Sequence, residues 1–526
     1  MPPVATALTI AQLFANAAQA YGDRPAIEDA GHIISYRQLD QLRRQAARAL
    51  LALDVQVGDR VAIWAPNVWE WIVAAGALQS VGAALVPLNT RMKGSEAGYI
   101  LRESGACVLF AIGEFLGADY PGMLTSEDLP ALRHIVSVRG ANSGTLAWER
   151  FMDLAADVPQ LALRTREQSV GPQALSDVLF TSGTTGKPKG VMTSHGQNLR
   201  IVRDWSDIVG LRESDRYLIV NPFFHSFGYK AGWLAALMRG CTLLPQQVFD
   251  VQAVLECVQR ERITVLPGPP TLYQSLLAHP QRNEFDLSSL RVAVTGAAAI
   301  PVEMIHRMRD ELGFATIVTA YGLTEVCGFA TICRSGDSAE LVANTSGRAM
   351  PGVQVRCVGS SGRSQPANIP GEVQIRGYNL MQGYLNNPEA SQEILDADGW
   401  LHTGDIGMLD EQGYLRITDR LKDMFITGGF NVYPAEIEQC LLTYPGVAQA
   451  AVIGIPDERL GEVAMAFLLP APGMEIEQTR FLAWCREQMA NYKVPRRVQV
   501  LQKMPINAAG KVTKNVLREW ALQPVD

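Results

Sequence analysis

The sequence predicts an α/β protein with a large multi-lobed N-terminal domain, containing two parallel-rich α/β lobes, and a small α+β C-terminal domain. Its 526 residues suffice for several domains with ample core. Between about residues 60 and 330, short β-branched runs alternate with helix-like segments such as 251–262 and 302–312. This alternation predicts parallel sheets covered by helices, with ligands beyond the carboxyl ends of the strands. The expected strands are 60–64, 107–112, 177–181, 263–266, 292–295 and 317–319, and a first helix is expected at 10–21.

The pattern changes after residue 346. Residues 353–358 and 372–376 alternate like antiparallel strands around a loop rich in Gly, Ser, Pro and Asn, which predicts a small β-barrel-like lobe. Past Arg420 the pattern restarts, with strands near 450–455 and 464–469 and a helix near 476–489. The expected domains are therefore residues 1–420 and residues 421–526.

Composition and charge exclude several classes of protein. The net charge of -7 argues against nucleic acid as a partner, because phosphate contacts need a basic surface. The eight cysteines form no CxxC pair and the histidines no HExxH pattern, which favours a reducing cytoplasm and argues against structural zinc. The start of the chain lacks the basic residues of a signal peptide, and the apolar stretch 64–88 is interrupted by Pro66, Glu70 and Pro87. We expect a soluble protein, and the sequence carries no signal of its oligomeric state.

Residues 180–190, FTSGTTGKPKG, combine three glycines, two lysines and four hydroxyl side chains directly after the apolar run 177–180. A strand that ends in such a loop presents backbone N–H groups, hydroxyls and positive charge to one small volume, as polyphosphate requires. The spacing differs from a P-loop, because the glycines lie too close together and Pro188 stands where Ser or Thr is needed. The alternative is a flexible surface turn.

Three shorter motifs carry side chains suited to a nucleotide. In AYGLTE, residues 320–325, the aromatic, hydroxyl and carboxylate groups suit a base, a phosphate and Mg²⁺; the alternative for Glu325 is a helix-start carboxylate. In HTGDIG, residues 402–407, Asp405 suits the two ribose hydroxyls, or else an Asx-type turn. Lys511 follows a glycine near the chain end, where a lone lysine is usually a solvated surface charge.

Residues 417–438 add Arg420, the Lys422-Asp423 pair and adjacent glycines at 428 and 429, which let a thin ligand approach closely. Each motif alone is weak evidence of function.

The order of all the motifs along the chain is much more specific. The sequence resembles the adenylate-forming acyl-CoA synthetases, relatives of firefly luciferase and of peptide-synthetase adenylation domains. The resemblance covers essentially the whole chain, in the order TSGTTGKPKG, FFHSFG, TGAAAIP, AYGLTE, GWLHTGD, DRLKD, GGFNVYPAEIE and the terminal GK.

The resemblance implies a site that binds ATP and Mg²⁺ and makes an acyl-adenylate. Thr181 and Glu325 are expected to place Mg²⁺, and Tyr321 to stack on adenine. Lys511 is expected to reach the substrate carboxylate and the α-phosphate, where negative charge develops during the attack. His225 is expected beside the reacting acyl group, or else as a buried structural histidine. The implied catalytic residues are Lys511, His225, Glu325 and Thr181, and the implied nucleotide contacts are Thr181, Ser182, Gly183, Thr184, Thr185, Gly186, Lys187, Lys189, Gly296, Ala297, Tyr321, Gly322, Thr324 and, for the ribose, Asp405 and Arg420.

The resemblance also implies a second half-reaction, in which the thiol of coenzyme A attacks the adenylate. In this family the C-terminal domain is mobile and swings about a hinge residue, here Lys422. The rotation would withdraw Lys511 and bring Gly428 and Gly429 to the pantetheine tunnel. Family members are reversibly acetylated at the residue matching Lys511, so a lysine acetyltransferase and a deacetylase are expected partners.

The acyl group is less evident from the sequence. Within the family the chain resembles ligases of bacterial steroid breakdown, which activate the propionate of a methyl-indanedione; the cue is NPFFHSFGYKAG, residues 221–232. Tyr229 and Lys230 are suited to ring carbonyl oxygens, which a fatty tail lacks, but Lys230 is equally expected to point to solvent or to a carboxylate. The expected acyl pocket comprises His225, Phe227, Tyr229, Lys230, Gly296 and Gly322. The alternatives are a medium- or long-chain fatty acid and, third, an aryl or cyclic carboxylate.

The sequence is also compatible with two other classes of function. One is an acyl-AMP ligase that loads a carrier protein; such members carry an extra insertion, and none is evident between Tyr321 and Arg420. The other is a non-catalytic nucleotide-binding relative, which predicts loss of Lys511, Glu325 or Asp405, and all three are present.

Overall fold

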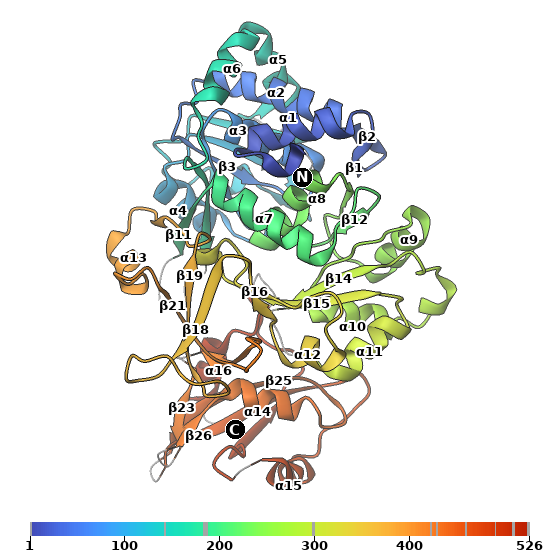
Figure 1. The fold of residues 1–526 in the computed structure, drawn as a ribbon, viewed down its shortest axis with the longest axis vertical. Coiled ribbons are helices and arrows are strands. Elements are labelled where there is room, and N and C mark those ends of the chain that lie inside the picture. The colour runs from blue at the N-terminus through green and yellow to red at the C-terminus, as the bar shows by residue number, and fades with distance from the viewer. Residues whose placement is uncertain are drawn as a thin grey trace. The chain divides into compact units, whose positions relative to one another are not determined.

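The computed structural model describes residues 3–140, 144–181, 188–296, 300–420, 423–427, 430–457, 460–489, 491–507 and 511–522. The fold is α/β, as predicted, with a large N-terminal domain and a smaller C-terminal domain (Figure 1). Contacts divide the chain into a first compact unit, Met1–Gln354 with Arg376–Leu401, and a second, Val355–Ile375 with His402–Asp526. The predicted domain limits at residues 420 and 421 stay a prediction.

An eight-stranded sheet forms the upper part of the first unit (Figure 1). Its central strands are parallel, and β11 and β20 extend one edge in antiparallel pairing. Asp177 on β10 pairs in register with Leu85 on β4, so the strand that leads to the glycine-rich loop belongs to the parallel core. In spatial order the strands are β20 (Gly383–Tyr384), β11 (Lys189–Ser194), β10 (Leu175–Thr181), β4 (Ala84–Pro87), β3 (Arg60–Trp64), β5 (Val108–Ile112), β8 (His134–Arg139) and β9 (Leu146–Ala147).

A second group of strands in this unit carries the AYGLTE motif. Strands β14 and β15 pair in parallel, and single bridges from Val265 to Tyr217 and to Val292 connect them with the neighbouring four strands. The strand expected at 263–266 is thus only a bridge, because Pro267 and Pro269 lack the N–H groups that would extend the pairing. The strands are β1 (Pro25–Asp29), β2 (His32–Ser35), β12 (Arg216–Ile219), β13 (Thr242–Pro245), β14 (Val292–Gly296), β15 (Thr316–Tyr321), β16 (Thr331–Ile332) and β17 (Arg348–Ala349).

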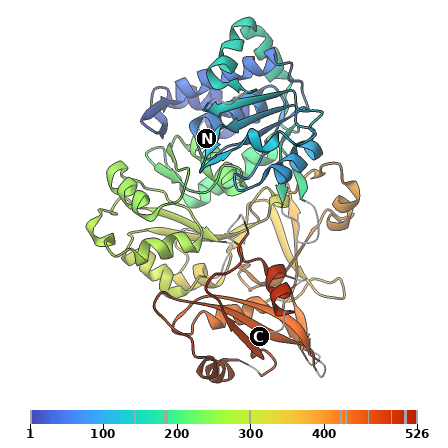
Figure 2. The same cartoon turned by 180° about the vertical axis from the view of Figure 1, so that it is seen from behind.

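Helices cover these sheets, and Figure 2 shows them from the opposite side. Helix α1 begins after Thr9, whose hydroxyl accepts a hydrogen bond from the N–H of Gln12, and the observed bounds match the expected 10–21. Helix α3 is buried on every face from Glu70 onward, so it forms the centre of the core rather than a surface layer. The helices are α1 (Ile10–Tyr21), α2 (Tyr36–Ala52), α3 (Trp69–Ser80), α4 (Gly94–Ser104), α5 (Trp148–Asp153), α6 (Gln160–Ser169), α7 (His195–Val209), α8 (Ala235–Arg239), α9 (Val251–Glu261), α10 (Pro270–Ala278), α11 (Val302–Asp310), α12 (Ala339–Asn344) and α13 (Pro388–Ile394).

The second unit is built around two sheets of its own. Its larger sheet packs α14 and α15 around buried Phe425, Phe481 and Leu468. The other sheet corresponds to the expected β-rich lobe, with β18 (Val353–Val358), β19 (Gly371–Gly377), β21 (Leu401–Leu409) and β22 (Leu415–Arg420) in that order. The remaining elements are β23 (Phe425–Thr427), β24 (Phe430–Val432), β25 (Val447–Asp457), β26 (Gly461–Pro470), β27 (Arg497–Val500), α14 (Pro434–Leu441), α15 (Gln478–Gln488) and α16 (Lys514–Ala521).

Two kinds of feature are absent from the described ranges. No helix within them has the length and the apolar character needed to cross a membrane. The same ranges contain no cluster of three or more His, Cys, Asp or Glu side chains placed to hold a metal ion.

Candidate active site

Strands β10 and β11 pair in antiparallel fashion and carry the two ends of the glycine-rich motif. Thr181, the last residue of β10, lies opposite Lys189, the first residue of β11, and its hydroxyl donates to the Lys189 carbonyl at 3.5 Å. The hairpin therefore presents the two ends of the motif side by side. The predicted contacts between them, Ser182, Gly183, Thr184, Thr185, Gly186 and Lys187, lie outside the described residues.

Tyr384 contacts both the residue expected to hold Mg²⁺, Glu325, and a residue expected to bind phosphate, Lys189. Its hydroxyl donates to Oε1 of Glu325 at 2.8 Å, and Nζ of Lys189 lies 5.1 Å from the centre of its ring. Burial and the Glu325 carboxylate raise the pKa of the Tyr384 phenol far above its usual value, so the phenol keeps its proton and acts as a donor. The sequence did not single out Tyr384, because one aromatic residue after a glycine carries no chemical signal.

Glu325 lies in a short 3₁₀ helix, η6 (Thr324–Val326), which the chain holds against β20. The backbone N–H of Met381 donates to the Glu325 carbonyl at 2.8 Å, and the side-chain amide of Asn379 donates to the carbonyls of Val326 and Phe329. Both the backbone and the carboxylate of Glu325 thus have fixed partners. Tyr384 uses one of the lone pairs of a carboxylate that offers about four, so the remaining oxygen positions suit a hard cation such as Mg²⁺.

The ends of β14 and β15 require glycine at two of the predicted positions. Gly296 pairs with Ala320, and a Cβ at Gly296 would lie 2.7 Å from the Ala320 carbonyl oxygen. A Cβ at Gly322 would lie 2.1 Å from the carbonyl oxygen of Gly328, which no side chain tolerates. Tyr321 ends β15 and is half-buried, and Ala297 lies outside the described residues.

The His225 segment leads into a π-helical stretch, η4 (Phe227–Leu234), a rare conformation that is frequent at functional sites. His225 is exposed, so the alternative of a buried structural histidine is wrong. Phe227 packs with Trp205 and Phe329 at ring-centre distances of 6.4 and 6.0 Å. Because Phe329 follows the AYGLTE motif, these contacts join two of the predicted motifs.

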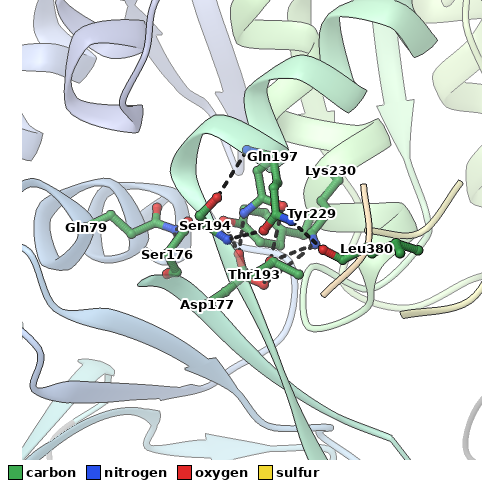
Figure 3. A network of polar contacts seen from close by, with 10 residues as sticks. Gln79, Ser176, Asp177, Thr193, Ser194, Gln197, Tyr229, Lys230 and Leu380 are labelled. Atoms are coloured by element: carbon green, nitrogen blue, oxygen red, sulfur yellow. Dashed lines mark hydrogen bonds and ion pairs between the residues drawn. The ribbon is translucent and has the colours of Figure 1, made fainter. Parts of the chain in front are cut away.

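Tyr229 and Lys230, expected in the acyl pocket, direct their polar atoms into the protein (Figure 3). Nζ of Lys230 lies 3.6 Å from Oδ1 of Asp177, and both side chains are fully buried. The Tyr229 hydroxyl accepts from Nε2 of Gln79 at 2.7 Å and donates to Oδ2 of Asp177 at 3.4 Å. Lys230 was expected to meet either a ring carbonyl of the substrate or, as the alternative, solvent or a carboxylate. The observed geometry agrees with a carboxylate partner. Whether the two residues contribute to the acyl pocket stays a prediction.

In the second unit the two predicted ribose residues are neighbours. Asp405 on β21 lies directly opposite Arg420 on β22 in the antiparallel register. Asp405 is buried within a strand, and its N–H donates to the Thr403 hydroxyl at 3.0 Å. Gly404 before it has a φ of +68°, a conformation that favours glycine.

Lys511 closes a turn near the chain end. Its N–H donates to Oδ1 of Asn507 at 3.0 Å, and its carbonyl accepts from the Asn507 N–H at 2.8 Å. Lys511 is exposed, as a residue that must reach a substrate requires. The predicted hinge Lys422 and the tunnel residues Gly428 and Gly429 lie outside the described residues.

A nucleotide-binding α/β enzyme with a separate C-terminal domain is the class of protein that these features define. Residues 14–385 match the family described as AMP-binding enzyme, and residues 436–511 match the AMP-binding enzyme C-terminal domain. The chain belongs to the AMP-binding enzyme family, and it is an AMP-forming acyl-CoA ligase that uses ATP and coenzyme A.

Three comparisons show how close the likeness is. A 7a-methyl-1,5-dioxo-octahydro-1H-inden-4-yl propanoyl:CoA ligase of Mycobacterium tuberculosis is 53% identical over 475 residues, which cover 90% of this chain and 91% of that protein. The ligase of the same description from Rhodococcus jostii is 47% identical over 511 residues, covering 96% and 97%. The crystal structure of an anthranilate CoA ligase with anthranoyl-AMP is 28% identical, covers 98% of this chain and 97% of its own, and superposes with a TM-score of 0.87.

Proposed function

We propose that the protein joins coenzyme A to the propionate side chain of a bicyclic, methyl-indanedione acid. The observation that carries this proposal is the near full-length similarity to two ligases whose descriptions give that acyl group. The two alignments cover 90% and 96% of this chain. Residues 14–385, which match the AMP-binding enzyme family, include the segment 221–232 that leads into η4.

The first half-reaction makes an acyl-adenylate. The hairpin from Thr181 to Lys189 holds the β- and γ-phosphates, and Tyr321 stacks on adenine. Asp405 and Arg420, in register on β21 and β22, hold the ribose. The carboxylate of the substrate attacks the α-phosphorus, pyrophosphate leaves, and Lys511 stabilises the negative charge that develops on the oxygens.

Mg²⁺ fits the oxygen donors of this site. The Thr181 hydroxyl and the Glu325 carboxylate would hold it, and Tyr384 orients Glu325 through its 2.8 Å hydrogen bond. A bound Mg²⁺ would neutralise charge on the phosphates of ATP. The chain itself supplies the orientation, because the donated phenol proton fixes the rotamer of the carboxylate.

The second half-reaction makes the thioester. The thiolate of coenzyme A attacks the acyl carbonyl of the adenylate, and AMP leaves. Lys422 acts as the hinge about which the C-terminal domain turns, and Gly428 and Gly429 admit the pantetheine arm. Acetylation of Lys511 would remove its charge and stop the first half-reaction.

The substrate proposal is tested by a panel of acids under one set of conditions. kcat/KM for thioester formation is measured with the bicyclic keto acid, octanoate, palmitate and an aryl carboxylate. The keto acid is expected to be preferred, and a much higher kcat/KM for either fatty acid would overturn the proposal. Thioester formation with coenzyme A alone, without a carrier protein, separates this function from that of an acyl-AMP ligase.

A further inference from the structure

A buried polar network lies beneath the site and connects its motifs. We call it the Asp177 network. Its members lie on α3, β10, β11, α7 and η4 and are Gln79, Ser176, Asp177, Thr193, Asn198, Tyr229 and Lys230. Figure 3 labels all of them except Asn198. The side chains of Asp177 and Lys230 are both 0% exposed. No contact of the network with solvent therefore competes with its internal partners.

Asp177 is the acceptor at the centre of this network. Its Oδ1 accepts from the Thr193 hydroxyl at 2.7 Å and lies 3.6 Å from Nζ of Lys230. Its Oδ2 accepts from Nδ2 of Asn198 and from the Tyr229 hydroxyl at 3.4 Å. Lys230 also donates to the Thr193 hydroxyl at 3.3 Å. Both charges are thus compensated by fixed groups from four different segments of chain.

The two charged residues lie on segments that end in the candidate site. Asp177 precedes Thr181 on β10, the strand that enters the phosphate-binding hairpin. Lys230 lies after Phe227 on η4, and His225 lies just before that element. The pair therefore connects η4 with the strand that enters the hairpin.

The network also reaches the segment behind Glu325. Burial raises the pKa of the Cys327 thiol to about 11, and the Lys230 ammonium and a hydrogen bond with Thr193 act against this rise. Cys327 has a positive φ of 57° and is fully buried, so its conformation depends on the surrounding packing. The segment from Glu325 to Cys327 thus lies within electrostatic range of the same ion pair.

A buried ion pair is a poor source of stability, since well-packed apolar side chains in its place are often as stable or more so. Removing one partner, in contrast, leaves an uncompensated charge that the interior cannot solvate. Such a pair tolerates only a narrow range of spacings between the segments that carry it. It can therefore favour one arrangement of these segments over others, even where it adds little to stability.

We propose that the Asp177–Lys230 pair is a positioning element that holds the acyl-pocket segment η4 at a fixed distance from the phosphate-binding hairpin. The proposal rests on the proposed function of these two segments. Neither residue touches the reacting atoms; they act through His225 and Phe227 on one side and through Thr181 on the other. The pair thereby keeps the binding sites for the acid and for ATP in the positions that both substrates need in order to bind.

The test compares two variants of the full-length protein, K230M and the double variant D177N/K230Q. ATP–pyrophosphate exchange gives kcat and the KM values for ATP and for an acid that the wild type activates. K230M leaves the Asp177 carboxylate unpaired, and we expect the KM values for the acid and ATP to rise about tenfold while active-site-titrated kcat changes less. D177N/K230Q places two neutral amides that can hydrogen-bond across the same gap, and we expect KM within about threefold of the wild type.

The matched control is R43M. Arg43 is 1% exposed and pairs with Asp40 and Glu167 at 2.8 and 2.7 Å, and none of these residues belongs to the site. R43M is expected to lower the thermal midpoint without changing either KM. If K230M behaves like R43M, with a lower thermal midpoint and unchanged KM values, the Asp177–Lys230 pair has a merely structural role. That result would overturn the proposal.

A second variant covers the case in which K230M does not fold. T193V removes the hydroxyl between Asp177 and Lys230 without leaving a charge unpaired, and we expect a rise of about threefold in the KM for the acid. An unchanged KM in T193V would overturn the proposal as well. If none of the acids tested supports ATP–pyrophosphate exchange by the wild-type protein, the proposed function itself is refuted. The two failures are therefore distinguishable.

Discussion

The phenol hydroxyl of Tyr384 donates a 2.8 Å hydrogen bond to Oε1 of Glu325 and so joins the edge strand β20 to the AYGLTE motif. The same tyrosine ring lies beside the ammonium of Lys189 at the base of the phosphate-binding hairpin. The two motifs that are expected to share Mg-ATP are therefore connected by a residue outside both of them.

Replacing Tyr384 with Phe is expected to weaken the response to Mg²⁺. The change removes the donor that orients Glu325, and a hydrogen bond to a charged group is typically worth enough to shift an affinity about tenfold. The measurement is the Mg²⁺ concentration that half-saturates ATP–pyrophosphate exchange. Tyr378→Phe is the control, because its hydroxyl donates to Asp204 at 2.9 Å. An equal shift in both variants would contradict the role of Tyr384.

Replacing Lys511 with Ala is expected to separate the two half-reactions. Adenylate formation should fall by about 10²–10³, because the variant loses a donor aimed at the developing charge. Thioester formation from preformed acyl-AMP should change little. The control is Lys503→Ala, at an exposed lysine on the same unit. A comparable loss in both half-reactions would count against the assigned role of Lys511.

Replacing Lys422 with Pro is expected to have the opposite effect. Proline fixes φ at the proposed hinge, so the domain that carries Lys511 stays in its adenylate-forming position. Acyl-AMP should form at nearly the wild-type rate and accumulate, and thioester formation should be blocked. The hinge assignment fails if Lys422→Pro depresses both steps equally, or if Lys422→Ala has the same effect as proline.

His195 predicts a pH dependence of stability. Burial lowers its pKa from 6.5 to about 4, and its Nδ1 accepts from the N–H of Ile10 at 3.2 Å. The unfolded chain therefore binds a proton between pH 6.5 and 4 that the folded chain refuses, and the contribution to stability is lost as the pH falls through this window. Between pH 7.5 and 5.0 the loss amounts to about 2 kcal/mol.

The variant His195→Asn tests this assignment. Its side-chain oxygen can accept the same hydrogen bond but does not titrate, so the decrease in unfolding free energy between the two pH values should shrink by about 2 kcal/mol relative to the wild type. Urea unfolding at both pH values measures the difference. Identical decreases in the two proteins would show that His195 is not the titrating group.

Local signals predicted much of the fold. Helix α1 has the expected bounds because its apolar period is regular and Thr9 caps it. Helices α9 and α11 and strands β14 and β18 also occupy the expected segments. The strand expected at 263–266 is reduced to bridges at Val265, since the prolines that follow end the pairing.

The site was predictable only where chemistry is concentrated in one short segment. The glycine-rich loop and AYGLTE are such segments. The family resemblance assigns Asp405 and Arg420 to the ribose, and the two residues lie opposite each other in the strand register; their role stays a prediction. Tyr384 and Asp177 were missed as partners because their roles come from contacts between distant segments. A lysine such as Lys230 has the same appearance in sequence whether it meets a substrate or a buried carboxylate.

The most direct measurement of the central claim is a single-turnover reaction of the purified full-length protein with α-labelled ATP, Mg²⁺ and the bicyclic keto propionate. The account predicts stoichiometric pyrophosphate release and a labelled acyl-AMP that coenzyme A converts to AMP and thioester. The absence of pyrophosphate and of labelled adenylate with this acid and with a broad library of other acids would contradict it.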